Sequence, residues 1–143
     1  VKTNYLLKSK SSIRVIVGIS IAVGLLHFLI GPEYQGPLRL FLTAYLIDIL
    51  LPMNVYLLAQ LPLRKQFTVN NSRILAALGT LVFGFAVEYL QYLGLDFLGN
   101  TFDPWDLFMY ALGVGLGLGI DISVLDRWEK RHGESSFSDG KLR

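Results

Sequence analysis

Four long apolar stretches make up most of the chain, and each is bounded by prolines, glycines or charged residues. They cover residues 13–30, 38–61, 74–95 and 104–125. A helix needs about 20 mostly apolar residues, at about 1.5 Å per residue, to cross the hydrocarbon core of a bilayer. The pattern therefore predicts an all-α integral membrane protein, folded as a four-helix bundle.

Polar segments separate and flank these stretches. Residues 1–12 form a polar leader, and residues 126–143 form a charged tail, in which 134–140 has a composition typical of disorder. The first connection, 31–37, contains two prolines and two glycines, which suits a tight turn between antiparallel helices. Pro62 is expected to end the second span, so that 63–73 becomes a polar, basic loop.

Two helix starts can be predicted from capping chemistry. Asn71 or Ser72 is a suitable N-cap for the third span. Asp103 precedes a proline, and Asp106 lies in the first turn, where an acid interacts favourably with the helix dipole. The fourth span should therefore begin at Asp103, and Trp105 suits the interfacial region of a membrane.

Composition supports the membrane class. Of the 143 residues, 52% are hydrophobic and only 17% are charged, against about 25% charged residues in soluble domains. The formal net charge of +2 is too small to indicate a nucleic-acid partner. The absence of cysteine excludes disulfides and thiolate metal sites.

The distribution of basic residues predicts the orientation. Twelve of the thirteen lie in the leader, at the start of the first span, in the second loop or in the tail. Arg39 alone lies on the other side. Cytoplasmic loops are enriched in Lys and Arg, so both termini should be cytoplasmic. This alternation requires the second span to cross fully, although Asp48 and Pro52 interrupt it and predict a kink.

A polar cluster is predicted at the outer end of the last two spans. Glu88 and Gln91 are three residues apart and share one face of a helix. Asp103 and Asp106 open the next helix after a short loop, and Tyr110 follows one turn later. These five side chains should converge on one outward-facing site. Helix capping alone also explains the two aspartates, and hydrogen bonding between helices also explains Glu88.

Acids in hydrocarbon are costly to ionise. Glu88, the deepest of the cluster, is therefore expected to carry a proton. Asp48 is expected near the middle of the bilayer, either as a neutral acid hydrogen-bonded between helices or as part of a proton relay.

The fourth span carries four glycines at alternate positions: Gly113, Gly115, Gly117 and Gly119. They contain two overlapping GxxxG spacings, which allow close approach of helix backbones, so a packing role is expected for all four. A dinucleotide-binding loop would need a βαβ unit, which the pattern lacks. Asp121 does not match the spacing of intramembrane aspartyl proteases.

No cofactor, metal site or catalytic residue is predicted. His27 and His132 lie far apart in the sequence, and no paired histidine spacing indicates a metal site. Ser20 and His27 are two turns apart on one helix, which is too far for a nucleophile and its base.

The stretch from Glu88 to Gly117 resembles the signature of the VanZ-like family of small integral membrane proteins. Glu88, Gln91, both aspartates, Gly113 and Gly117 match that pattern. Asn100 stands where the family usually has Arg, and Tyr110 where it usually has Asn. The resemblance covers about a fifth of the chain, and it implies a link to glycopeptide (teicoplanin) resistance.

Three functions remain open at this point. The resemblance implies an envelope protein whose outward polar pocket binds a cell-wall or lipid-linked ligand. Small size and glycine packing also suit a structural accessory subunit of a larger, energy-converting membrane complex. A carboxylate-based transporter would need the four helices to oligomerise. The expected partners are the lipid bilayer and other membrane subunits or copies of the same chain.

Overall fold

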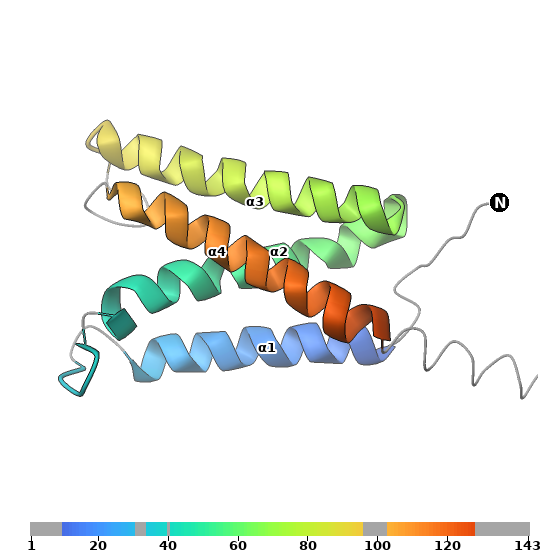
Figure 1. Ribbon diagram of the computed structural model, residues 1–143, viewed down its shortest axis with the longest axis horizontal. Helices are drawn as coiled ribbons and strands as arrows, with labels where there is room; N and C mark the ends of the chain where they lie inside the picture. The colour runs from blue at the N-terminus through green and yellow to red at the C-terminus, as the bar shows by residue number, and fades with distance from the viewer. Residues whose placement is uncertain (1–9, 31–33, 40, 96–102, 128–143) are drawn as a thin grey trace, which may run out of the picture.

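The computed structural model of the chain describes residues 10–30, 34–39, 41–95 and 103–127, and these contain four long helices and no strand (Figure 1). The helices are α1 (Lys10–Leu29), α2 (Leu46–Gln66), α3 (Val69–Tyr92) and α4 (Pro104–Ile120). Two π-helical segments, η1 (Phe41–Tyr45) and η2 (Asp121–Leu125), extend α2 at its start and α4 at its end. The prediction of an all-α protein with four helices is confirmed.

The helices run antiparallel in sequence, so the bundle has two distinct ends (Figure 1). We call the end with Lys10, Gln66, Val69 and Leu125 the proximal end. The opposite end, where α1 finishes and α4 starts, is the distal end. Of the regions discussed above, most of the leader (1–9), Asn100 and most of the tail (128–143) lie outside the described residues.

All four helices are long and apolar enough to cross a membrane. The candidate spans are Ser12–Leu29, Phe41–Gln66, Val69–Tyr92 and Pro104–Leu125. The second, of 26 residues, continues through Pro52 and Pro62 without a break. It therefore has the length of a full span.

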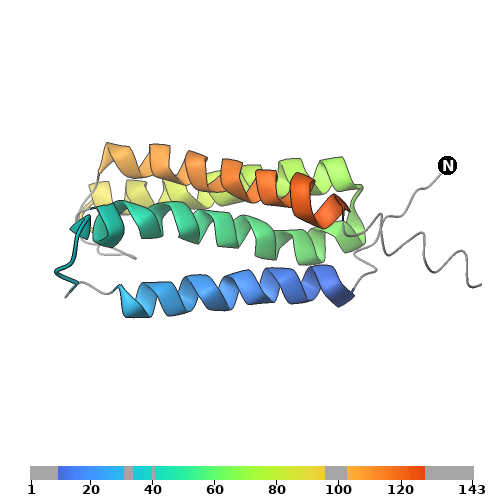
Figure 2. The same cartoon turned by 60° about the horizontal axis from the view of Figure 1, so that its bottom comes forward.

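Helix α2 is central in the packing. It contacts α4 most extensively and also packs against α3, while α1 lies mainly on the opposite side of α2 (Figure 2). The buried core joins all four helices and η2, through Ile16, Val23, Met53, Tyr56, Leu57, Ala76, Val114 and Leu125. Large apolar side chains elsewhere, such as Phe28 and Val82, are exposed, as expected where lipid replaces water.

The predicted loop over 63–73 is wrong. Helix α2 continues through Pro62 to Gln66, and α3 begins at Val69, so only Phe67 and Thr68 connect them. The N-cap of α3 is Thr68, whose hydroxyl accepts from the backbone N–H of Asn71 at 3.4 Å, and not Asn71 or Ser72. The polar residues of this stretch indicated a loop. In the structure, however, Arg64 and Arg73 form ion pairs with Asp121, which lies in another part of the chain.

The predicted start of α4 is confirmed. Asp103 is the N-cap, and its carboxylate accepts from the backbone N–H of Trp105 at 2.9 Å. Pro104 occupies the first helical position, where a missing N–H costs nothing. Trp105 is exposed, and its ring meets Phe108 edge to face, with centroids 6.3 Å apart.

Candidate functional site: a distal cluster of acids

Four carboxyl groups from three helices gather at the distal end. Asp48 comes from α2, Glu88 from α3, and Asp103 and Asp106 from the start of α4. Asp48 interacts electrostatically with Glu88 and Asp103, and Asp106 interacts with the other three. We call these four residues the distal acidic cluster.

Glu88 is the most deeply buried member, with 1% of its surface exposed. The hydroxyl of Tyr110 donates to Glu88 Oε1 at 2.9 Å, which ties α4 to α3. The other carboxyl oxygen, Oε2, is buried and has no hydrogen-bond partner among the described residues. Leaving a buried polar atom unpaired is costly, so this oxygen marks a place where a proton, a water or a ligand group would bind.

Gly84 makes room for the tyrosine that supports Glu88. A Cβ at Gly84 would lie 2.6 Å from Cδ2 of Tyr110, so the absence of a side chain at Gly84 leaves room for the Tyr110 ring beside α3. Gly84 and Glu88 are one turn apart on the same face of α3. The sequence alone did not indicate this role for Gly84, because Tyr110 lies in another helix.

No basic side chain balances the cluster among the described residues. Each ion pair there joins Arg64 or Arg73 to Asp121 or Asp126, at the proximal end. The described residues also contain no group of three or more side chains arranged to hold a metal ion. The cluster is therefore suited to sharing protons or to binding a positively charged group, since either would offset the repulsion between its carboxylates.

The structure brings the predicted polar side chains, Asp48 included, to one end of the bundle. Glu88, Asp103, Asp106 and Tyr110 meet as expected, and Gln91 lies one turn beyond Glu88 on α3, half-buried. The placement of Asp48 near mid-span was wrong. The span runs from Phe41 to Gln66, so Asp48 lies in its distal third and joins the cluster.

A second polar group, which the sequence analysis missed, lies at the proximal end. Asp121 in η2 is fully buried and pairs with Nη2 of Arg64 in α2 and, at 2.8 Å, with Nε of Arg73 in α3. Arg73 Nη2 also meets Asp126 Oδ2 at 2.7 Å. We call these four residues the proximal ion-pair network.

Two neutral side chains complete this network. Tyr56 donates to Asp121 Oδ2 at 3.2 Å, and Arg64 Nε donates to Gln60 Oε1 at 3.1 Å. Among the described residues, the side chains that donate to the Asp121 carboxylate come from α2 and α3, so η2 is fixed to both helices. Two arginines and two aspartates balance in charge, which makes a structural role the simplest account of the proximal end.

Spacing along α2 was the signal that could have revealed this network. Tyr56, Gln60 and Arg64 are each four residues apart and therefore lie on one face of a helix. Treating Pro62 as a helix end removed Arg64 from that face. With α2 continued, a polar stripe in an apolar span would have required buried partners.

The four glycines of α4 divide into two pairs. A Cβ at Gly113 would collide with the backbone carbonyl of Ile49, and one at Gly117 would lie 2.7 Å from Cδ1 of Tyr56, so both glycines pack against α2. A Cβ at Gly115 or Gly119 would meet no atom within 4 Å. The expectation of packing for all four is therefore wrong within this chain, because residues two apart lie on opposite faces of a helix.

Comparisons with protein-family models, curated proteins and solved structures found no match to this chain. The distal acidic cluster and the sequence resemblance are therefore the observations that bear on its function.

Proposed function

We propose that this chain is a VanZ-like protein of the bacterial cytoplasmic membrane, whose distal acidic cluster binds a cell-wall or lipid-linked ligand from the outer side. The observation that carries the proposal is the buried Glu88, with one oxygen held by Tyr110 and the other unpartnered. Residues of the family signature, Glu88, Asp103 and Asp106, belong to this one cluster. A purely structural acid would be expected to have both oxygens satisfied.

The proposal includes an orientation with both termini in the cytoplasm. The positive-inside rule supports it, since Arg39 is the one basic residue expected on the distal side. In that orientation the cluster faces the cell exterior. Asp103 and Asp106 are half-buried and form the rim, and Glu88 lies behind them.

The test is teicoplanin susceptibility of a glycopeptide-sensitive bacterium that expresses the chain. Glu88→Gln keeps the shape of the side chain but removes its charge and its titration. We expect wild type to raise the inhibitory concentration of teicoplanin and Glu88→Gln to abolish that rise, at equal amounts of folded membrane protein. Tyr110→Phe should reduce the rise, because Glu88 loses the hydroxyl that holds it in place.

Tyr89→Phe is the matched control, because Tyr89 is exposed on the same helix as Glu88 and lies outside the cluster. No rise in resistance with wild type would contradict the proposed function. Full activity of Glu88→Gln would exclude a titrating or cation-binding Glu88 and leave only a structural role for it.

The accessory-subunit hypothesis predicts a different result. Gly115 and Gly119 present small residues outward on α4, a surface that another helix could approach closely. If the chain is a subunit, gentle solubilisation should yield it in a fixed stoichiometry with other proteins, as measured by native mass spectrometry. Isolation of the chain alone would favour the ligand-binding function.

A further inference from the structure

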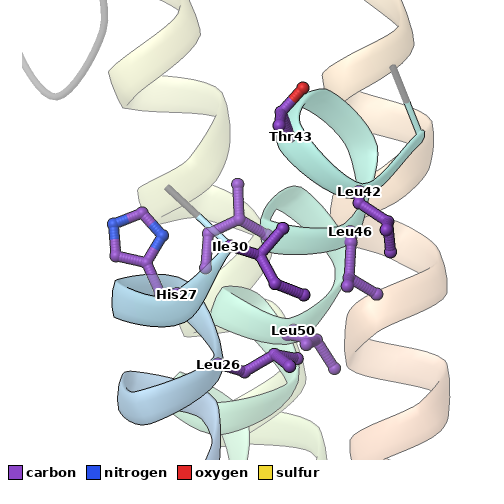
Figure 3. Close-up of a pocket in the computed structure, with 8 residues that line it drawn as sticks. Leu26, His27, Ile30, Leu42, Thr43, Leu46 and Leu50 are labelled. Atoms are coloured by element: carbon purple, nitrogen blue, oxygen red, sulfur yellow. The ribbon is translucent and has the colours of Figure 1, made fainter. Parts of the chain in front are cut away.

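A cavity of about 260 Å³ lies between the end of α1 and the start of α2, near the distal end (Figure 3). Its lining comes from the end of α1, from η1 and from the first two turns of α2: Leu26, His27, Ile30, Leu42, Thr43, Leu46, Ile47 and Leu50. The cavity is separate from the distal acidic cluster, which lies between α2, α3 and α4.

The lining requires an apolar occupant. Six of the eight side chains are leucine or isoleucine, and that of Leu26 points from α1 towards α2 (Figure 3). An apolar cavity of about 150 Å³ stays dry and takes up small hydrocarbons. This one is larger and lies between two helices with the length and composition of membrane spans, where the available hydrocarbon is a lipid tail.

The backbone beside the cavity is irregular. Leu38 has a φ of 58°, in the left-handed region that a branched side chain rarely adopts, and η1 forms a π-helical turn over Phe41–Tyr45. Such turns occur often at functional sites. The turn places Leu42 and Thr43 on the cavity wall.

The distal rim of the cavity offers a group that suits a phosphate. The Thr43 hydroxyl donates to the backbone carbonyl of Arg39 at 2.8 Å, so Arg39 lies one turn above the cavity wall on the distal side. Arg39 is exposed and is the one basic residue expected at this face of the membrane. Its guanidinium is a donor to phosphate oxygens. The imidazole of His27 points to the side of α1 away from α2 and does not contribute to this rim (Figure 3).

We propose that this cavity binds one acyl chain of an anionic phospholipid, with the lipid phosphate held by Arg39. The leucine and isoleucine lining recognises the tail, and the guanidinium of Arg39 selects the charge of the headgroup. The site rests on the helices spanning a bilayer, but it is independent of what the distal acidic cluster binds.

The experiment is a lipid titration of the purified chain in detergent, followed by native mass spectrometry. The probes are dioleoyl phosphatidylglycerol and dioleoylglycerol, which share the same tails and differ in the phosphate-bearing headgroup. We expect one phosphatidylglycerol per chain, bound at least tenfold more tightly than dioleoylglycerol. Arg39→Gln should remove this preference and leave the binding of dioleoylglycerol unchanged.

Leu46→Trp should fill the cavity and weaken phosphatidylglycerol binding at least tenfold. Leu26→Phe narrows the cavity from the α1 side and should act in the same direction, which keeps the test valid if the tryptophan unfolds the bundle. Leu51→Trp is the matched control, because Leu51 is exposed on α2 and does not line the cavity. Thermal unfolding by circular dichroism verifies that each variant is folded.

Three results would overturn the proposal. Equal weakening by Leu51→Trp would mean that the lipid binds the general apolar surface. A headgroup preference that survives Arg39→Gln would place the phosphate elsewhere. Loss of a dimer in Leu46→Trp, without loss of lipid, would make the cavity an interface between copies of the chain.

Discussion

Asp121 illustrates how much one buried side chain can determine. It lies in η2, is completely buried, and accepts from Arg64, Arg73 and Tyr56, which belong to two other helices. A buried charge is tolerated only where partners surround it, so Asp121 and its two arginines depend on one another. This single carboxylate joins the C-terminal end of the described bundle to its central helix.

Asp121→Asn should be strongly destabilising. The amide retains the shape but leaves the buried guanidinium of Arg64 and the half-buried one of Arg73 with a single carboxylate between them, and breaking a buried pair in this way costs about 3–5 kcal/mol. Asp126→Asn is the matched comparison, because Asp126 also meets both arginines but is 28% exposed at its side chain. The midpoint of thermal unfolding should fall much further for Asp121→Asn. Equal midpoints for the two variants would contradict the proximal ion-pair network.

The distal acidic cluster provides the corresponding contrast at the other end. It joins four acids and a tyrosine with no basic side chain among the described residues, so a proton shared within the cluster is the simplest way to reduce the repulsion. Infrared difference spectroscopy should detect the C=O stretch of a protonated carboxylic acid at neutral pH. The band should change in Glu88→Gln, which removes one of the four acids, and stay unchanged in Tyr89→Phe. A wild-type spectrum without such a band would show that all four acids are ionised.

At the scale of elements, α4 packs closely on α2 because of two glycines. Gly113 meets the backbone of α2 at Ile49, and Gly117 meets Tyr56 and the carbonyl of Met53. Backbone atoms cannot move aside as a flexible side chain can. The spacing of four between these glycines places both on the contact face, and this regularity was visible in the sequence.

Substitution of the two pairs of glycines should therefore give opposite results. Gly113→Ala should lower the unfolding temperature clearly, since its Cβ collides with a backbone carbonyl of α2. Gly115→Ala is the control, because its Cβ meets nothing, and alanine is about 0.5–1 kcal/mol better than glycine in a helix. An unchanged unfolding temperature in Gly113→Ala would place this face towards lipid. A change of assembly size in Gly115→Ala would identify that glycine as part of an interface with another chain.

Sequence patterns predicted the elements well where the cause is local. Helix number follows from apolar length, and the start of α4 follows from Asp103 and Pro104. The two-residue turn after α2 was not predicted. Arg64 is held by Asp121, 57 residues away, and that pairing keeps α2 helical beyond Pro62. The polarity of neighbouring residues cannot reveal a partner so distant in the chain. For the same reason the local pattern could not show that Asp48 lies at the end of the bundle where it interacts with Glu88.

At the scale of the whole molecule, charge and polarity are segregated between the ends. The distal end collects four carboxyls, whereas the proximal end pairs two aspartates with two arginines. The proximal ion-pair network and the distal acidic cluster thus lie at opposite ends of α2, α3 and α4. We expect substitutions at the proximal end to change stability first, and those at the distal end to change function first.

The orientation of the bundle in the membrane is the last prediction. Arg64 and Arg73 are paired in the folded protein, but α2 and α3 precede Asp121 in the chain. If helices insert in order, both arginines are still unpaired when the hairpin of α2 and α3 enters the membrane, so they count towards the positive-inside rule. Together with the leader and the tail, they favour a cytoplasmic proximal end.

The chain contains no cysteine, so single cysteines can report its orientation directly. In intact cells, an impermeant thiol reagent should label a cysteine placed at Gln35, beside the distal end, and should not label one at Ser11 or Ser138. All three positions should react after the membrane is permeabilised, which verifies that each cysteine is accessible. Labelling of Ser138→Cys but not Gln35→Cys in intact cells would invert the bundle. The distal acidic cluster would then face the cytoplasm, and an envelope ligand could not reach it from outside.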